Sequence, residues 1–350
     1  MSTELFDPNA PAGTRGIFGL PHSPEESRVV LVPVPWEATV SYGGGASNAP
    51  DAILRASRQV DLFDRDTGKP YEVGIAMLRI SDTVKAWSDE AKILAAGVIA
   101  GGGARGDAQL EKDLDHVNDL GRRLNAWVAT ETRGWLECDK IVGIIGGDHS
   151  APLGAITSFA DKYPGLGILH IDAHADLRVA YEGFTFSHAS IMDNVIRDVP
   201  GVSKLIQVGV RDYCEQEDEA IRNSAGRIKT FFESDVRREL LDAGSWRRVC
   251  SRIVAELPEN VYISFDIDGL DPTLCPHTGT PVPGGLSFGE MVVLFKTLVD
   301  TGRTIVGFDL VEVAPDPSGI SEWDGNVAAR ALYKMIGFAL LSNPGLPDAA

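Results

Sequence analysis

Residues 166–176, LGILHIDAHAD, decide the fold, because a buried strand and a polar cluster meet in this segment. It begins as a short apolar run and ends in Asp172, His174 and Asp176. Runs that are apolar throughout, rather than alternating with polar residues, are typical of parallel strands buried on both faces. Five further runs of this kind predict strands at residues 29–35, 141–147, 205–211, 261–269 and 305–313.

Segments with helical periodicity separate these runs. They cover residues 49–62, 110–137, 150–162, 188–198, 233–257, 287–300 and 323–341. Alternation of strands and helices predicts an α/β fold with a parallel sheet. Residues 86–109 are rich in Ala and Gly, and we expect an insertion with a flexible tip there. We expect an extended arm over residues 1–27, a single domain over 28–342 and a C-terminal tail over 343–350.

The amino-acid composition limits the kinds of molecule that the protein is expected to bind. The chain has 350 residues, with 32 basic and 50 acidic side chains and a formal net charge of −18. This charge repels nucleic acids and anionic membranes, whereas it attracts a small cationic substrate. No apolar run is long enough for a membrane span, and the N-terminus does not resemble a secretory signal. Four scattered cysteines exclude a disulfide scaffold, so we expect a cytoplasmic protein.

Three polar clusters lie where predicted strands end, at residues 146–150 (GGDHS), 170–176 (HIDAHAD) and 266–269 (DIDG). Residues two apart in an extended chain point to the same side, so Asp172, His174 and Asp176 project together. Open α/β sheets bind ligands outside the carboxyl ends of their strands, where all three clusters can meet. Carboxylates packed at the end of an apolar sheet need a positive charge to neutralise them.

The residue types in these clusters favour two divalent cations. Taken alone, each motif is more often a turn, a cap or a loop, but three together are typical of a metal site. Oxygen-rich ligation without thiolates favours Mn²⁺, and imidazole ligands also admit Ni²⁺. A two-metal site can lower the pKa of a shared water to ~7 and so supply a hydrolytic nucleophile. The candidate ligands are two imidazoles and four carboxylates: His149, His174, Asp172, Asp176, Asp266 and Asp268.

The motifs GGDHS, DAHAD and SFDIDGLDP resemble the metal-binding signatures of the ureohydrolase family, which includes arginases, agmatinases and guanidinases. The resemblance covers residues 28–340 and implies a three-layer α/β/α sandwich around a mostly parallel, eight-stranded sheet. It also implies a homo-oligomer, a trimer or hexamer, and a hetero-oligomer stays open. One metal would be held by His149, Asp172, Asp176 and Asp266, and the other by Asp172, His174, Asp266 and Asp268.

The same resemblance assigns roles beyond the metal ligands. His188 resembles the histidine that carries a proton to the leaving amine, for which a pKa near neutrality is suitable. Glu312 resembles the carboxylate that pairs with the substrate guanidinium through two parallel hydrogen bonds. Asp148 is expected to orient a ligand rather than to bind metal. His170 is interpreted as a core residue of its strand.

The substrate is the least determined feature. Phe184 and Phe186 lie beside His188, and Trp323 lies in a segment that resembles the guanidinase branch. These aromatic residues favour an apolar pocket for guanidine or a small alkylguanidine, cleaved to urea and ammonia or an amine. Trp323 either stacks on the cation or anchors the N-terminal end of the last helix. An agmatinase, which releases putrescine and urea from agmatine, is the near alternative. A non-catalytic assembly subunit and a one-zinc, deacetylase-like enzyme are the remote alternatives.

Overall fold

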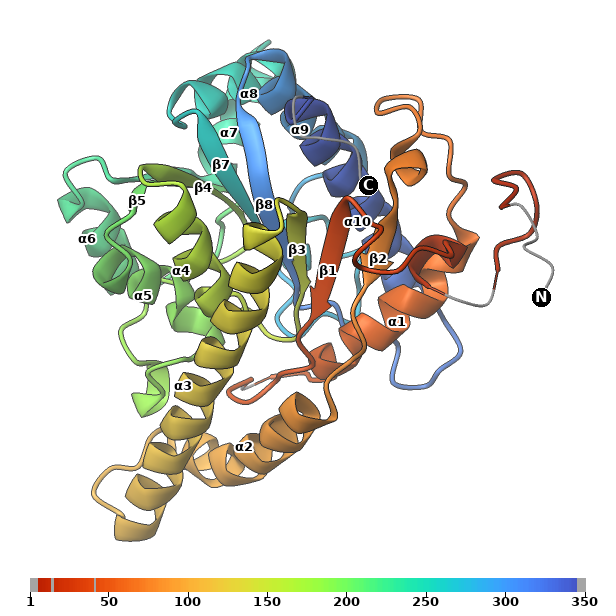
Figure 1. The fold of residues 1–350 in the computed structure, drawn as a ribbon. Coiled ribbons are helices and arrows are strands. Elements are labelled where there is room, and N and C mark those ends of the chain that lie inside the picture. The colour runs from red at the N-terminus through yellow and green to blue at the C-terminus, as the bar shows by residue number, and fades with distance from the viewer. Residues whose placement is uncertain (1–5, 14–15, 41, 345–350) are drawn as a thin grey trace.

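A single parallel sheet forms the centre of the molecule (Figure 1). The structure, a computed structural model, describes residues 6–13, 16–40 and 42–344. The strand order is β2-β1-β3-β8-β7-β4-β5-β6, and every pair of neighbours is parallel. The strands are β1 (Val29–Pro33), β2 (Ile75–Met77), β3 (Ile141–Ile145), β4 (Leu166–Ile171), β5 (Val202–Val208), β6 (Ile228–Phe231), β7 (Asn260–Asp266) and β8 (Thr304–Val311).

Helices cover both faces of this sheet. The helices of one layer share a hydrophobic core with it, and they are α2 (Asp82–Gly101), α3 (Ala108–Glu137), α4 (Leu153–Lys162) and α5 (Ile191–Asp198). The other layer consists of α1 (Ala49–Ala56), α7 (Glu233–Leu241), α8 (Trp246–Ala255), α9 (Phe288–Asp300) and α10 (Trp323–Ser342). The helix α6 (Glu215–Asn223) lies between β5 and β6 in the chain.

Strand β3 shows why the sheet is buried on both sides. Ile141 and Ile145 belong to the core of one layer, whereas Val142 and Ile144 belong to the core of the other. Side chains of a strand alternate between its faces, so a strand covered twice is apolar along most of its length. The predicted three-layer α/β/α sandwich with an eight-stranded sheet is therefore confirmed.

Two strands and two helices, α2 and α6, were not predicted. The strands β2 and β6 lie at the two edges of the sheet and have only 3 and 4 residues. Such short segments do not stand out from loop sequence by their hydrophobic pattern. The helix α6 was missed because only one of its residues, Glu217, is buried. The single helix predicted over residues 233–257 is two helices, α7 and α8, separated by a turn at residues 242–245.

The expected insertion at residues 86–109 is wrong, because most of it is the helix α2. Ser81 caps this helix by accepting a hydrogen bond from the Val84 amide. Its buried residues are spaced three or four apart, as in an amphipathic helix that packs on one face, and they are Val84, Ser88, Ala91, Ala95 and Val98. Alanine is the strongest helix former, and only the glycines at residues 101–103 end the helix.

Part of the N-terminal segment packs against the domain. Ile17, Phe18 and Leu20 are buried, and the Phe18 ring lies 4.8 Å from the ring of Tyr333 in α10. The Phe18 amide donates a hydrogen bond to Ser57 Oγ at 2.8 Å. Residues 1–5 of the expected arm and 345–350 of the expected tail lie outside the described residues. Among the described helices, none has the length and apolar character of a membrane span.

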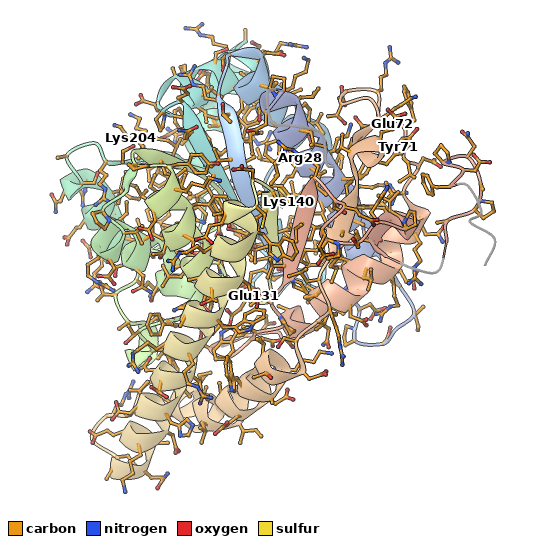
Figure 2. The ribbon with its side chains drawn as sticks, in the orientation of Figure 1. Arg28, Tyr71, Glu72, Glu131, Lys140 and Lys204 are labelled. Atoms are coloured by element: carbon orange, nitrogen blue, oxygen red, sulfur yellow. The ribbon has the colours of Figure 1, made fainter. Side chains whose placement is uncertain are left out.

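The two ends of the strands differ in chemistry. At the amino ends, Arg28 donates to the main-chain carbonyl of Asp139, and Lys140 donates to that of Glu25, so both cations satisfy backbone groups (Figure 2). The polar motifs found in the sequence all follow the carboxyl ends. The candidate functional residues therefore lie at the carboxyl edge of the sheet.

Gly307 of β8 tests the packing of α4 against the sheet. A Cβ atom at this position would lie 2.1 Å from the ring of Phe159, which is fully buried. We expect Gly307→Ala to lower the free energy of unfolding by about 1–3 kcal/mol, the usual cost of overpacking a core. The control is Gly289→Ala in α9, where the added Cβ meets nothing within 4 Å. Urea unfolding of both variants checks this, and an unchanged midpoint for Gly307→Ala contradicts the packing.

Candidate metal centre

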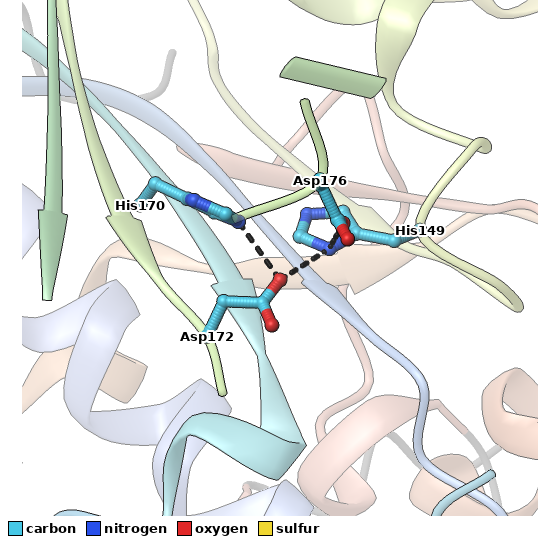
Figure 3. Close-up of side chains that lie close together, drawn as sticks. All are labelled: His149, His170, Asp172 and Asp176. Atoms are coloured by element: carbon cyan, nitrogen blue, oxygen red, sulfur yellow. Dashed lines mark hydrogen bonds and ion pairs between the residues drawn. The ribbon is translucent and has the colours of Figure 1, made fainter. Parts of the chain in front are cut away.

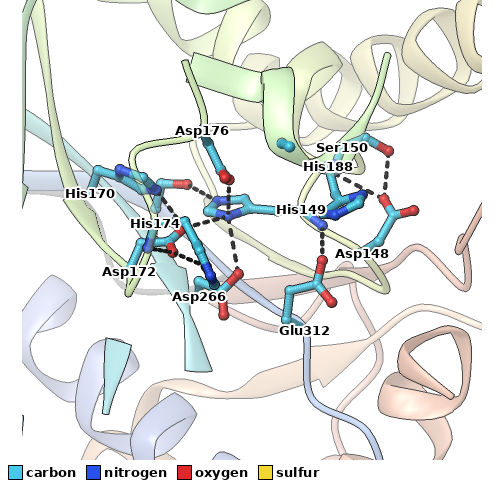
Figure 4. A network of polar contacts seen from close by, with 12 residues as sticks. Asp148, His149, Ser150, His170, Asp172, His174, Asp176, His188, Asp266 and Glu312 are labelled. Atoms are coloured by element: carbon cyan, nitrogen blue, oxygen red, sulfur yellow. Dashed lines mark hydrogen bonds and ion pairs between the residues drawn. The ribbon is translucent and has the colours of Figure 1, made fainter. Parts of the chain in front are cut away.

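The three polar motifs meet at the carboxyl edge of the sheet (Figure 4). His149 follows β3, the segment from Asp172 to Asp176 follows β4, and Asp266 is the last residue of β7. Strand β8, which lies between β3 and β7, adds Glu312 one residue beyond its end. The order of the strands thus brings together side chains that are far apart in the sequence.

The first cluster surrounds the imidazole of His149 (Figure 3). His149 Nδ1 lies 3.0 Å from Asp172 Oδ2, 3.1 Å from Asp176 Oδ2 and 3.3 Å from Asp266 Oδ2. All of these side chains are buried. Four of the predicted ligands therefore converge on one point, and they are the four that the family resemblance assigns to one metal.

The second cluster surrounds His174. Its Nδ1 atom lies 3.1 Å from Asp268 Oδ2 and 3.4 Å from Asp172 Oδ1. The two oxygens of Asp172 therefore face different histidines, Oδ2 toward His149 and Oδ1 toward His174. A carboxylate that bridges two cations has this orientation, with one oxygen for each.

The hydrogen bonds of His149 test whether the site suits a cation. Ser264 Oγ donates to Asp309 Oδ1 at 3.2 Å, so it accepts from His149 Nε2 at 3.0 Å. The proton is thus on Nε2, and Nδ1 is a buried nitrogen without a hydrogen-bond partner in the described part of the chain. This nitrogen and three carboxylates face the same point, which is unfavourable unless a positive charge lies between them. The donor set therefore fits a divalent metal.

The electrostatics of the cluster lead to the same conclusion. Burial raises the pKa of Asp176 to about 7, and the negative charge of Asp172 adds to this shift. Burial and the charge of Asp268 likewise raise the pKa of Asp266 well above its usual range. Carboxyl groups that resist ionisation together become favourable as carboxylates when a divalent cation is bound.

Main-chain amides hold the ligands in place. Asp172 Oδ1 accepts from the His174 amide at 2.6 Å, and Asp268 Oδ1 accepts from the Ala173 amide at 2.9 Å. Asp266 Oδ1 accepts from the Asp268 amide at 2.8 Å. The loops after β4 and β7 are therefore tied to each other through the ligands themselves, which orients the carboxylates before a cation arrives.

Glu312 has a strained backbone. Its φ of 60° is in the left-handed region, which costs a residue with a side chain of order 1–3 kcal/mol. Its amide donates to Gly147 O at 2.7 Å, and Thr278 Oγ1 donates to its carbonyl at 2.8 Å. Glu312 Oε1 accepts from the His149 amide at 2.8 Å. Burial raises the pKa of this carboxyl, and a guanidinium ion beside it would favour the ionised form.

His188 is close to the clusters but contacts none of their carboxylates. Its Nδ1 lies 3.1 Å from Thr39 Oγ1, which also accepts from the His188 amide at 3.2 Å. The Thr39 hydroxyl proton is thus available to Nδ1. Burial lowers the pKa of His188 to about 4, and the nearby His174 contributes to the shift. The imidazole is therefore neutral at physiological pH, and its position suits proton transfer rather than metal binding.

Asp148 supports the loop that carries His149. Its Oδ2 accepts from the Ala38 amide at 2.9 Å, and its Oδ1 accepts from the Ser150 amide at 3.0 Å. Burial raises its pKa to about 6. These contacts join the loop after β1 to the loop after β3, so Asp148 affects the site by fixing the backbone beside His149.

A cavity of about 180 Å³ opens over the cluster. The guanidinium of Arg178 lies over the ring of Tyr181 at 4.8 Å, and its Nε is 3.7 Å from Glu217. The carboxylate of Asp212 is exposed and has no hydrogen-bond or ion-pair partner among the described residues. The cavity is lined by His149, His174, Asp176, Arg178, Tyr181, His188, Ala189, Asp212, Tyr213, Glu217, Asp266, Thr280 and Glu312.

Comparison with known proteins agrees with the geometry. Residues 27–337 match the arginase family. The chain belongs to this family. An N(1)-aminopropylagmatine ureohydrolase of Thermus thermophilus is 31% identical over 326 residues, which cover 92% of this chain and 94% of that protein. An agmatinase of Bacillus cereus is 30% identical over 291 residues, which cover 83% and 85% of the two chains.

Solved structures of the family share the fold. Agmatine ureohydrolase of Thermoplasma volcanium superposes with a TM-score of 0.71 at 22% identity, covering 93% of this chain and 94% of that one. Arginase of Bacillus subtilis superposes with a TM-score of 0.62 at 21% identity, covering 89% and 99%. The resemblance to the ureohydrolases is therefore confirmed, and this arginase-family protein is a hydrolase of guanidino C–N bonds.

The placement of three aromatic residues corrects the expected pocket of this arginase-family enzyme. Phe184 is 1% exposed and belongs to the core of the α2–α5 layer. The Phe186 ring packs against Gly121 of α3. Trp323 is half exposed, and its Nε1 donates to Thr273 O at 3.0 Å. None of the three lines the cavity. Phe184 and Phe186 turn inward to cover the core and α3, and Trp323 is the first residue of α10.

Proposed function

We propose that the enzyme hydrolyses a guanidino compound that carries a second cationic group, agmatine or a derivative of agmatine, to urea and an amine. The observation that carries this proposal is the exposed carboxylate of Asp212 on the wall of the cavity that contains the metal cluster, since no described residue pairs with it. A cationic tail would find a partner there, whereas the α-carboxylate of arginine would be repelled. Relatives named agmatinase and N(1)-aminopropylagmatine ureohydrolase support the same substrate class.

Different residues would bind the metals, bind the guanidinium and transfer a proton. We propose two cations, Mn²⁺ or Ni²⁺, one held by His149, Asp172, Asp176 and Asp266 and the other by Asp172, His174, Asp266 and Asp268. When bound, such cations supply a hydroxide nucleophile at neutral pH, since they lower the pKa of water to ~7. Glu312 would accept hydrogen bonds from the guanidinium and orient its carbon toward the cluster. His188 would carry a proton to the departing amine.

Guanidine or a small alkylguanidine is the second candidate substrate. Glu312 and the metal cluster would serve it equally well, but the aromatic wall that favoured it in the sequence does not line the cavity. A non-catalytic assembly subunit is disfavoured, because the complete set of candidate ligands converges together with His188 and Glu312. The homo-oligomer and the cytoplasmic location remain predictions.

A substrate panel tests the proposed function. The protein is freed of metal, reconstituted separately with Mn²⁺ and Ni²⁺, and assayed for urea release from agmatine, N(1)-aminopropylagmatine, guanidine, methylguanidine and arginine. We expect the highest kcat/KM for one of the two agmatine compounds. Highest kcat/KM for guanidine would move the assignment to the second candidate, and a preference for arginine would refute both.

Asp212→Asn tests how the tail is recognised. A partly exposed, charged hydrogen bond is worth about 1–2 kcal/mol, so we expect KM for agmatine to rise about 5–30-fold with kcat little changed. KM for guanidine, which has no tail, should stay the same. The control is Asp61→Asn, the same charge change at an exposed residue of another loop. Equal effects of Asp212→Asn on both substrates would contradict a role in binding the tail.

A further inference from the structure

A line of polar side chains, which begins at the half-buried Thr230 and is otherwise buried, crosses three strands and ends at Asp172. Thr230 of β6 is in register with Gln207 of β5, and Gln207 is in register with His170 of β4. The His170 and Gln207 side chains are fully buried in a sheet whose buried positions are mostly apolar. Buried polar groups of this kind are costly unless each has a partner, so their hydrogen bonds define one arrangement.

The orientation of the Gln207 amide follows from its neighbours. One of its terminal atoms lies 2.7 Å from the carbonyl oxygen of Ala175, which can only accept, so that atom is the nitrogen Nε2. The other atom, Oε1, accepts from Thr230 Oγ1 at 2.8 Å. A flipped amide would place two oxygens against each other at the Ala175 carbonyl. The structure therefore admits one orientation of Gln207.

This orientation determines where His170 carries its proton. Gln207 Nε2 lies 3.0 Å from His170 Nδ1 and has a second N–H to donate, so Nδ1 is the acceptor. A neutral imidazole then has its proton on Nε2, which lies 2.8 Å from Asp172 Oδ2 (Figure 3). His170 is therefore a donor to the carboxylate that faces both His149 and His174.

We propose that Gln207 is a positioning residue of the metal centre, which acts by holding His170 as a hydrogen-bond donor to Asp172. This inference rests on the metal centre proposed above and not on the identity of the substrate. Asp172 then has both oxygens fixed, Oδ2 by His170 and Oδ1 by the His174 amide at 2.6 Å. The carboxylate is thereby oriented between the two clusters without a cation present.

The same contact keeps His170 from binding metal. Its ring nitrogens lie close enough to the polar atoms of His149, Asp172 and Asp176 to form a group of four possible ligands. A ligating nitrogen needs a free lone pair, and the lone pair of His170 Nδ1 is engaged by Gln207. The contact with Gln207 thus makes the two histidines different. His149 Nδ1 has no hydrogen-bond partner among the described residues and can bind a cation, whereas His170 cannot.

The first test uses the unchanged protein. Nitrogen NMR of ¹⁵N-histidine-labelled, metal-free enzyme reports which ring nitrogen carries the proton, and His170→Asn assigns the signals. We expect His170 to show a protonated Nε2 and an unprotonated Nδ1. Added Zn²⁺, used as a diamagnetic probe, should shift the His149 and His174 signals and leave the His170 proton on Nε2. A proton on Nδ1, or loss of the Nε2 proton with Zn²⁺, overturns the proposal.

The second test replaces Gln207, the residue that holds His170. In Gln207→Glu and Gln207→Leu we expect the affinity for Mn²⁺ to fall 10–100-fold, the usual effect of removing a group that orients a ligand. Gln59→Glu, at an exposed residue, is the matched control for the charge change. If Gln207 acts through His170, its substitution should change Mn²⁺ affinity much less in a His170→Ala background.

The outcomes separate this inference from the proposed function. An equal Gln207 effect in both backgrounds means that the residue acts through strand packing, and unchanged Mn²⁺ affinity in the single variants also refutes the proposal. If a Gln207 variant does not fold, the NMR test on the unchanged protein still decides. Absence of urea release from every substrate would refute the proposed function, but it would leave the His170 tautomer and the Mn²⁺ affinities to be judged separately.

Discussion

Asp172→Ala is expected to release at least one cation and to lower kcat for urea formation on the order of 10³-fold or more, the effect of losing several kcal/mol of metal-derived stabilisation. Its two oxygens face different histidines at 3.0 and 3.4 Å, so the substitution removes a carboxylate oxygen from both clusters at once. Metal content by elemental analysis and urea release on the same samples check this.

Two further variants make the result specific for the charge of Asp172. Asp172→Asn keeps the size of the side chain and should also lose metal, because an amide is a weaker ligand than a carboxylate. Asp161→Ala, at an exposed carboxylate of α4, is the control and should keep both metals. Two bound cations and normal turnover in Asp172→Ala would refute the two-metal assignment.

The convergence of the metal cluster was predictable because each motif can be recognised from a few adjacent residues. In each motif a polar residue lies at or just beyond the carboxyl end of a mostly apolar strand, and strands of a parallel sheet end at the same edge. His149, Asp172 and Asp266 could therefore be expected to converge before any contact was known. Their distances of 3.0–3.3 Å from a shared nitrogen depend on the order of β3, β7 and β4, which the strand sequences do not contain.

The walls of the cavity could not be found in the same way. Asp212 and Tyr213 follow β5 without any motif, and they reach the cavity because β5 lies beside β4. The direction of Phe184 and Phe186 is set by contacts with α3 and the core, which are distant in sequence. The line of hydrogen bonds from Thr230 through Gln207 to His170 likewise requires the register of β4, β5 and β6. Each of these features is non-local, and each escaped a residue-by-residue interpretation.

His188→Asn is expected to lower kcat by about 10²–10⁴-fold with unchanged metal content, the usual contribution of a positioned proton donor. The imidazole lines the cavity, contacts Thr39 and is bonded to none of the candidate metal ligands. Asparagine keeps a hydrogen-bonding group near Thr39 but cannot transfer a proton. The control is His116→Asn in α3, where the imidazole is half exposed and pairs with Glu90.

The lowered pKa of His188 also predicts how the free energy of unfolding of the metal-free protein depends on pH. This dependence is a second measurement of the role of His188. Burial lowers this pKa to about 4, whereas an unfolded histidine titrates near 6.5, so between these values the unfolded chain binds a proton that the folded chain does not. The contribution of His188 to the free energy of unfolding is therefore complete above pH 6.5 and is lost progressively as the pH falls toward 4. His188→Asn should flatten this part of the pH profile of the free energy of unfolding. Loss of metal in His188→Asn would make this residue a ligand, and normal kcat would remove it from the proton path.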